Sequence, residues 1–292
     1  MKNRAFAMIV IAGILWGTSG IFVHYLAPFG FSSLHMTFLR ALVSAVSLAS
    51  YIGIHNKRLF KVKPKELLLF ACGGLSFFGT AGCYYMSMQI TSVSTAVILM
   101  YIAPVLVMIF SVIFWREKLT MLKAAAVMAM LIGCCLVSGV VGGIRFDLWG
   151  IILGMMSGIF YSAYNIITKM QMRNGSDPIS ATFYCFASAA LIGLFVSGVQ
   201  EIPGIIGTRP VLLLFLIAGL GICTCVLPYF LYTLAMKVLP AGTATALGII
   251  EPMAATVFSV VLFKDQMGIF SLIGIILILG ATFMLNKDKE ID

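Results

Sequence analysis

The chain is 292 residues long, and 61% of these residues are hydrophobic while only 10% are charged. Soluble globular proteins contain roughly 45–50% apolar and about 25% charged residues, so this composition excludes a soluble domain and predicts an integral membrane protein. The formal net charge of +9 could suggest a nucleic-acid partner, but the positions of the basic residues, described below, argue against one.

Ten apolar segments follow one another along the chain, and the polar connections between them are too short to fold alone. A hydrocarbon core about 30 Å thick is crossed by ~20 helical residues, so each segment can span a membrane as an α-helix. The predicted fold class is therefore all-α and integral to the membrane. The predicted spans are 5–25, 33–54, 67–89, 93–114, 121–140, 148–169, 178–199, 210–236, 241–262 and 267–285.

The basic residues are distributed unequally between the two sides of these spans. With the amino terminus inside, 15 of them, including Lys289, fall on the cytoplasmic side, and only Arg145, Arg209 and Lys264 fall outside. This asymmetry predicts a multi-pass protein of the inner (plasma) membrane with both termini in the cytoplasm. The densest cluster, His55 to Lys65, could bind anionic lipid headgroups, although a topology signal alone is the simpler explanation.

Residues that could support catalysis or metal binding are sparse. The seven cysteines all fall within predicted spans, where free cysteine packs as a small hydrophobic residue, so we expect no disulfide framework, metal site or cofactor. His24, His35 and His55 lie at or near span ends. An embedded enzyme would need a nucleophile with a base, or a metal cluster, at depth. We therefore do not expect an enzyme. An embedded enzyme or a receptor is kept as the rival hypothesis from outside the transporter class.

The second half of the sequence repeats the first. At an offset of 148 positions Pro104 matches Pro252, and at an offset of 145 Trp16 matches Tyr161. Further pairs at the offset of 148 are Ser94-Thr95-Ala96 with Gly242-Thr243-Ala244, Ser111-Val112 with Ser259-Val260, and Glu117 with Asp265.

Each half, residues 1–142 and residues 143–292, holds five predicted spans. Because five is odd, the second half enters the membrane from the opposite side. We therefore predict ten transmembrane helices arranged as two inverted five-helix repeats. Such repeats can adopt two states related by symmetry, one open on each side of the membrane, which is the basis of alternating access.

Four short motifs occur in order along the two halves: Gly13-Ile14-Leu15-Trp16-Gly17, Phe38-Leu39-Arg40, Ala103-Pro104 to Glu117, and Glu251-Pro252 to Asp265. With this order, the chain resembles the EamA family of the drug/metabolite transporter superfamily over nearly its whole length. The resemblance implies a ten-helix basket around a central cavity and a carrier of small metabolites, commonly an exporter of amino acids or related compounds. It leaves the substrate open.

Two charged residues fall deep inside predicted spans, Arg40 in the second and Glu251 near the midpoint of the ninth. A charge at the bilayer centre costs ~2.5–3.5 kcal/mol on insertion scales, so we expect both side chains to face the interior or a wet cavity. Glu251 could exchange a proton during transport, pair with a substrate cation, or be a structural carboxylate. Arg40 could bind a substrate carboxylate, or bond a helix end or Glu251 and keep the halves in register.

Aromatic and polar side chains are the other candidates for a substrate site. Trp16 and Tyr161 lie too deep for an interfacial belt, so we predict that they line a central cavity and stack on aromatic or cationic groups. Interfacial anchoring could also explain the remaining aromatic candidates, which are Tyr84, Tyr85, Tyr101, Tyr164, Tyr229 and Tyr232. Asn165 could donate a hydrogen bond to a ligand, or equally bond its own backbone.

Pro104 and Pro252 lie near the middle of two matching spans. Each proline removes a helical hydrogen bond and loosens the helix at that level. We predict helix kinks there that could serve as gates.

Together these features predict a secondary transporter that exports a small polar metabolite, such as an amino acid, with protons as the coupling ion. An importer, or a carrier of organic cations such as quaternary amines, is the alternative within the same class. For such a carrier, Glu251 and the aromatic rings would form the binding cage. The expected partners are the lipid bilayer, the small-molecule substrate and protons, and the sequence leaves monomer and homodimer open.

Overall fold

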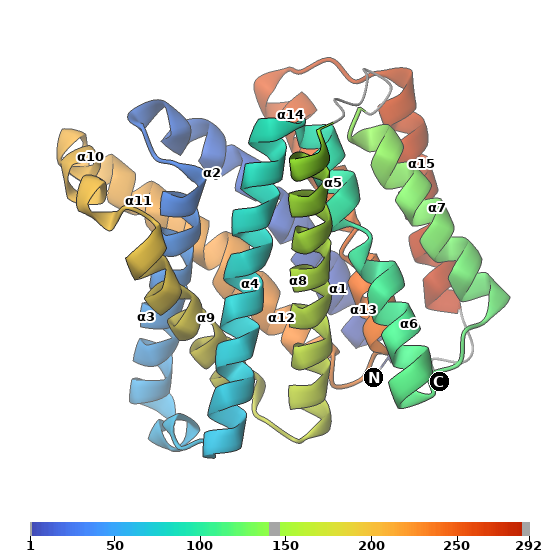
Figure 1. Cartoon of the computed structure of the whole chain (residues 1–292), viewed down its shortest axis with the longest axis horizontal. Helices are drawn as coiled ribbons and strands as arrows, with labels where there is room; N and C mark the ends of the chain where they lie inside the picture. Colours follow the sequence, from blue (N-terminus) through green and yellow to red (C-terminus); the bar gives the residue numbers. More distant parts are fainter. Residues whose placement is uncertain (1, 140–146, 288–292) are drawn as a thin grey trace.

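The structure, a computed structural model, describes residues 2–139 and 147–287. Within those ranges the chain forms helices and their connections, without a β-strand. Figure 1 shows long helices standing side by side, so the predicted all-α class is confirmed for the described residues. Arg145, Lys289 and the predicted junction between residues 142 and 143 lie outside the described residues.

The first half of the chain contains seven α-helices and two short 3-10 helices in its described part. They are α1 (Lys2–Gly17), α2 (Ser19–Leu26), η1 (Ala27–Phe29), α3 (Ser33–His55), η2 (Lys57–Phe60), α4 (Pro64–Ile90), α5 (Val93–Met100), α6 (Ala103–Trp115) and α7 (Met121–Val137).

The described part of the second half begins at α8 and includes one π-helical turn, η5. Its elements are α8 (Leu148–Arg173), α9 (Pro178–Val196), η4 (Val199–Glu201), α10 (Ile202–Thr208), α11 (Pro210–Gly221), η5 (Ile222–Val226), α12 (Leu227–Ala235), α13 (Ala241–Leu247), α14 (Ile250–Phe263) and α15 (Ile269–Lys287).

Every predicted span coincides with one helix or with two or three consecutive helical segments. In the part of the chain that the structure describes, nine helical segments are long and apolar enough to cross a membrane. The tenth, Met121–Val137, is apolar but shorter. The protein is therefore a multi-pass membrane protein, with helices where the hydrophobic segments predict them.

Three of the spans are interrupted near their midpoints. The helix breaks at Thr18, whose hydroxyl donates to the Leu15 carbonyl at 2.6 Å. It breaks again at residues 101–102, before Pro104, and at residues 248–249, before Pro252. Each proline stands in the first turn of the helix that follows, where its missing N–H costs no helical bond. The two proline breaks lie 148 positions apart.

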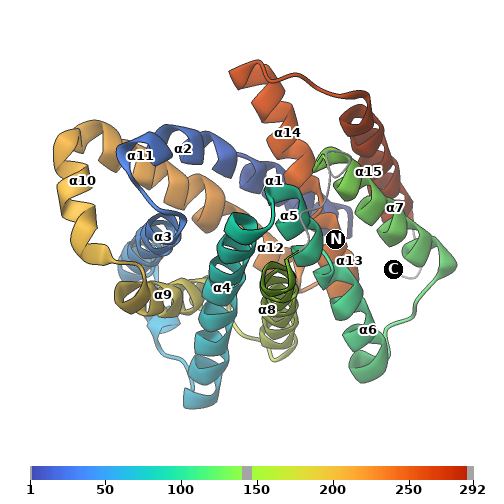
Figure 2. The same ribbon diagram turned by 45° about the horizontal axis from the view of Figure 1, so that its top comes forward.

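Helices from the two halves pack closely against one another. α4 lies along α8 and α9, α1 along α12 and α14, and α7 along α15. Close approach depends on small residues, because a Cβ added to Gly74 of α4 would lie 2.5 Å from the Cys185 carbonyl of α9. Figure 2 shows α7 and α15 together on one flank and α10 on the opposite flank.

The bundle has two ends, which we name by their loops. At the α3–α4 end lie the α3–α4 connection and the α8–α9 turn, drawn at the lower edge of Figure 1. At the α2–α3 end lie the α2–α3 turn and the α14–α15 connection, drawn at the upper edge.

Candidate substrate cavity

A cavity of about 570 Å³ begins at the level of the helix breaks and reaches the α2–α3 end. Its rim includes Val23 and Val93, which are 36% and 58% exposed. The volume lies within the roughly 300–1,000 Å³ of small-molecule sites. Residues that line its deeper part are Trp16, Arg40, Phe77, Tyr84, Tyr101, Tyr161, Tyr164, Thr224, Tyr229, Glu251 and Pro252.

Most of the residues predicted as a site therefore meet in one cavity. Trp16, Tyr84, Tyr101, Tyr161, Tyr164, Arg40, Glu251 and Pro252 all line it. Asn165, Tyr232 and Pro104 are not among the lining residues. Asn165 and Tyr232 are both fully buried, and the Tyr232 hydroxyl donates to Asn165 Oδ1 beneath the cavity floor. Pro104 is buried at the start of α6.

The floor of the cavity is a cluster of aromatic rings. The Tyr229 ring is at its centre, with centroids 5.1 Å from Trp16, 5.4 Å from Phe77 and 5.5 Å from Tyr164, all edge-to-face. Such pairs add about 0.5–1.5 kcal/mol beyond area burial, so they stabilise the ring cluster. Sequence reasoning missed Phe77. A periodic signal was present, because Phe77 precedes Tyr84 by two helical turns and so shares its face of α4.

Arg40 stands on one wall. Its guanidinium carbon lies 5.0 Å from the centroid of the Phe77 ring, a cation–π contact. In the described part of the chain, Arg40 Nε is buried without a hydrogen-bond partner, as is Trp16 Nε1. Two donors beside the cavity are thus left to a ligand.

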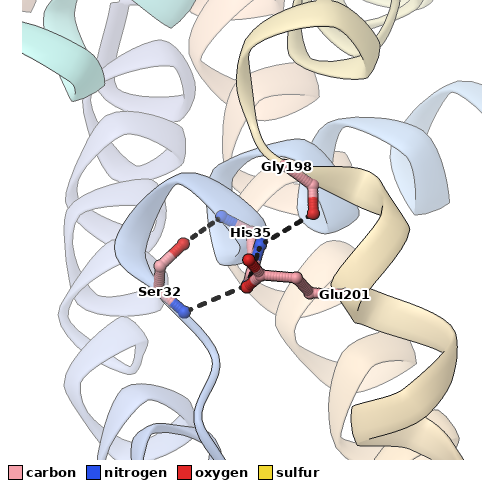
Figure 3. A network of polar contacts seen from close by, with 4 residues as sticks. All are labelled: Ser32, His35, Gly198 and Glu201. Atoms are coloured by element: carbon pink, nitrogen blue, oxygen red, sulfur yellow. Dashed lines mark hydrogen bonds and ion pairs between the residues drawn. The ribbon is translucent and has the colours of Figure 1, made fainter.

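The start of α3 is fixed by a polar network at the α2–α3 end (Figure 3). Ser32 Oγ accepts from the His35 backbone N–H at 3.1 Å, and the Ser32 N–H donates to His35 Nδ1 at 3.3 Å. His35 Nε2 is then left to donate to the Gly198 carbonyl at 3.2 Å, with Glu201 at 3.8 Å. This network ties α3 to η4 and holds the helix that carries Arg40.

Glu251 stands across the cavity, in the first turn of α14. Its Oε2 accepts a hydrogen bond from Tyr101 Oη at 3.2 Å. Tyr101 lies at the break between α5 and α6, and Glu251 follows the break between α13 and α14, so this bond joins the two interrupted spans. Tyr161 can pack against the break between α13 and α14 because residue 248 is glycine: a Cβ there would lie 2.9 Å from the Tyr161 hydroxyl.

Arg40 and Glu251 are the charged groups among the described residues that line the cavity. They do not approach within the 4.0 Å of an ion pair. In this conformation Arg40 and Glu251 therefore do not form the ion pair that would hold the two halves together. A cation and an anion instead face the same space from different walls.

Comparisons with known proteins agree with this architecture. Residues 3–139 and 148–287 match the model of the EamA-like transporter family. A protein of Archaeoglobus fulgidus named "Uncharacterized transporter" is 29% identical over 95% of this chain and 94% of its own length. An "Uncharacterized inner membrane transporter YicL" of Salmonella typhimurium is 21% identical over 97% of this chain and 95% of its own.

A solved structure has the same fold. It superposes with a TM-score of 0.77, covers 97% of this chain and 96% of its own, and is 21% identical.

Proposed function

Because the chain belongs to the EamA-like transporter family, we propose that this membrane transporter moves a small zwitterionic metabolite of the amino-acid class. In this proposal it is a secondary transporter that exports its substrate by alternating access in exchange for protons. A carrier of this kind makes and breaks no covalent bond, so the protein is no enzyme.

The observation that carries the proposal is the pair of separated charges in one cavity. An α-amino acid has a carboxylate and an ammonium group on one carbon, and its side chain points away from both. Arg40 can bind the carboxylate through its planar guanidinium, and Glu251 can accept from the ammonium. The ring cluster around Tyr229 is left for an apolar side chain.

Proton coupling follows from competition at one carboxylate. Glu251 can hold a proton or an ammonium group, but not both. A charged carboxylate without a partner at this depth is costly, which disfavours a return of the empty carrier with the group ionised. The substrate therefore travels in one direction and the proton in the other.

The proposed architecture is ten spans in two inverted repeats, residues 1–142 and 143–292. It is supported by two separate family matches, one in each half, and by the proline breaks at equivalent positions. For orientation we propose the α3–α4 end in the cytoplasm, because it carries the exposed basic cluster from Lys57 to Lys65. The inner-membrane name of the Salmonella relative supports the location.

The test compares three ligands of one shape. Phenylalanine, phenethylamine and 3-phenylpropionate share the ring but carry both charged groups, the ammonium alone or the carboxylate alone. Thermal stabilisation of the purified protein measures binding, because a ligand that binds only the folded state raises the apparent stability. We expect the zwitterion to bind at least about tenfold more tightly than either analogue, since each lost charged hydrogen bond is worth about 1.5–3 kcal/mol.

Variants assign the two charges. Arg40→Gln should reduce discrimination between phenylalanine and phenethylamine, and Glu251→Gln that between phenylalanine and 3-phenylpropionate. Arg209→Gln, at an exposed arginine outside the cavity lining, is the control. If phenethylamine binds as tightly as phenylalanine, the organic-cation carrier is the better assignment.

A further inference from the structure

Four residues of α8 form a stripe that leads from the cavity floor to the α3–α4 end. Tyr161, Asn165, Lys169 and Arg173 are spaced four apart, and residues at that spacing lie on one face of a helix. Tyr161 lines the cavity, Asn165 is fully buried, Lys169 is 8% exposed and Arg173 is exposed. A polar stripe of this kind on an apolar helix requires an explanation.

Each residue of the stripe below Tyr161 contacts a facing helix end. Asn165 Oδ1 accepts from the Tyr232 hydroxyl, whose oxygen also lies 3.4 Å from Thr245 Oγ1. Lys169 Nζ donates to the Met236 carbonyl at 2.9 Å and to the Leu239 carbonyl at 2.6 Å, in the turn between α12 and α13.

Arg173 completes the series, with its guanidinium carbon 5.3 Å from the ring centroid of Trp115, the last residue of α6. The stripe thus joins α8 to α12, α13 and α6 beneath the cavity. These contacts close the α3–α4 end.

Lys169 caps the carbonyls that follow α12 with a buried positive charge, which costs free energy of desolvation. Among the described residues no carboxylate lies within ion-pair distance of its Nζ, although Glu117 attracts it from farther away. The direct hydrogen bonds of this buried cation are therefore to two neutral carbonyls. The end of α9 at Val196, by contrast, has no basic residue in its last turn. Because desolvation of the Lys169 ammonium offsets much of the gain from its two hydrogen bonds, this contact can open at a modest cost in free energy.

The equivalent place in the first half is open. At the repeat offsets, Lys169 corresponds to His24 and Met236 to Met88. Met88 lines the open cavity, and the His24 ring stacks on Phe263 with centroids 4.0 Å apart. The same helical arrangement is therefore bonded shut at one end of the bundle and parted at the other.

We propose that the stripe on α8 is the closed half of the substrate path and that Lys169 is the latch that keeps it shut. This inference rests on the alternating-access part of the proposed function, and the latch itself can be tested without knowing the substrate class. When the latch opens, Asn165, Lys169 and Arg173 line a route from the α3–α4 end to Tyr161. The two cations then attract a carboxylate-bearing substrate toward the site.

The test uses one reporter cysteine for each half of the path. Val97 lines the open cavity, and its repeat equivalent Thr245 is fully buried beside Tyr232. Val97→Cys and Thr245→Cys are made separately in a background without the seven native cysteines. A membrane-impermeant maleimide is then applied from each side of sealed vesicles.

Lys169→Met removes the donor but keeps an unbranched side chain. We expect it to raise labelling of Thr245→Cys from the α3–α4 side by at least about tenfold, because two charged hydrogen bonds are lost and one alone is worth that factor. Labelling of Val97→Cys from the opposite side should fall, because one conformation is gained at the expense of the other. Lys169→Arg, which retains donors, should restore both rates toward those of the starting protein.

Lys237→Met is the matched control, since Lys237 is an exposed basic residue in the same α12–α13 turn. It should leave both rates unchanged. Unchanged rates in Lys169→Met, or rates that rise at both reporters as in a loosened fold, would overturn the latch. Because labelling needs no substrate, an incorrect substrate class leaves this result unaffected.

Discussion

Glu251→Gln is the sharpest test of coupling. Glutamine has the same shape as glutamate, and its carbonyl oxygen can still accept the hydrogen bond from Tyr101, which is 3.2 Å from Glu251 Oε2. Tyr101 is only 2% exposed, so this bond is shielded from water and should be preserved in the variant. We therefore expect the variant to fold while it loses the one group that can exchange a proton with the substrate.

The size of the effect follows from the number of acids in the cavity. Among the described lining residues Glu251 is the one carboxylate, so one proton should exchange for one substrate molecule. One unit of pH across the membrane is worth about 1.4 kcal/mol per proton, which corresponds to a tenfold concentration ratio. Protons leave the acidic compartment as substrate enters it, so substrate should accumulate about tenfold on the acidic side.

The assay is transport into proteoliposomes with one unit of pH imposed across the membrane. A zwitterion exchanged for a proton moves one net charge, so the membrane potential must be clamped at zero with potassium and valinomycin. Starting protein should reach a ratio of about ten, and Glu251→Gln a ratio of about one. Accumulation by Glu251→Gln at the original ratio would show that the carboxylate is structural, and a ratio near one hundred in the starting protein would reveal a second coupled proton.

Three further outcomes are expected. Gly74→Ala should destabilise the protein by about 1–3 kcal/mol through overpacking, because its Cβ would meet a carbonyl at 2.5 Å, whereas Gly82→Ala, with no atom within 4 Å, should not lower the melting temperature. In right-side-out cells an impermeant thiol reagent should label Arg209→Cys but not Lys61→Cys, and the reverse pattern would invert the proposed orientation. Trp16→Ala, which removes one ring from the cavity floor, should weaken substrate binding while the protein still folds; unchanged affinity would move the site elsewhere.

The positions of the helices were predictable because hydrophobic length alone determines them. No aqueous partner for the backbone exists in a bilayer, so a long apolar segment must be helical. Helix starts were also encoded locally, as at Asp147, whose carboxylate accepts from the Gly150 N–H at 3.0 Å. The start of α4 at Pro64, earlier than the predicted residue 67, has a similar local cause: Glu66 accepts from the Lys63 N–H.

The depth of individual side chains was less predictable. Tyr84 and Tyr232 are equivalent in the repeat, yet Tyr84 lines the cavity and Tyr232 is fully buried. The sequences around Tyr84 and Tyr232 are similar. The two tyrosines differ because the cavity is open at the α2–α3 end and closed at the α3–α4 end. In the proposed alternating-access cycle each of these residues would meet both environments, so no sequence pattern could assign Tyr232 and Asn165 to the closed end.

The charges break the symmetry of the repeat, and this has a mechanistic consequence. Arg40 comes from the first half and Glu251 from the second, while their equivalents, Cys185 and Ala103, are buried and uncharged. Both charges line the one cavity, Glu251 directly after a helix break and Arg40 in the second turn of α3. A conformational change that exchanges the open and closed ends can therefore leave the charged pair in place. If the gates alternate around a fixed site, as we propose, one arginine and one glutamate can serve both states, and a second copy of either would add an unpaired charge to the membrane interior.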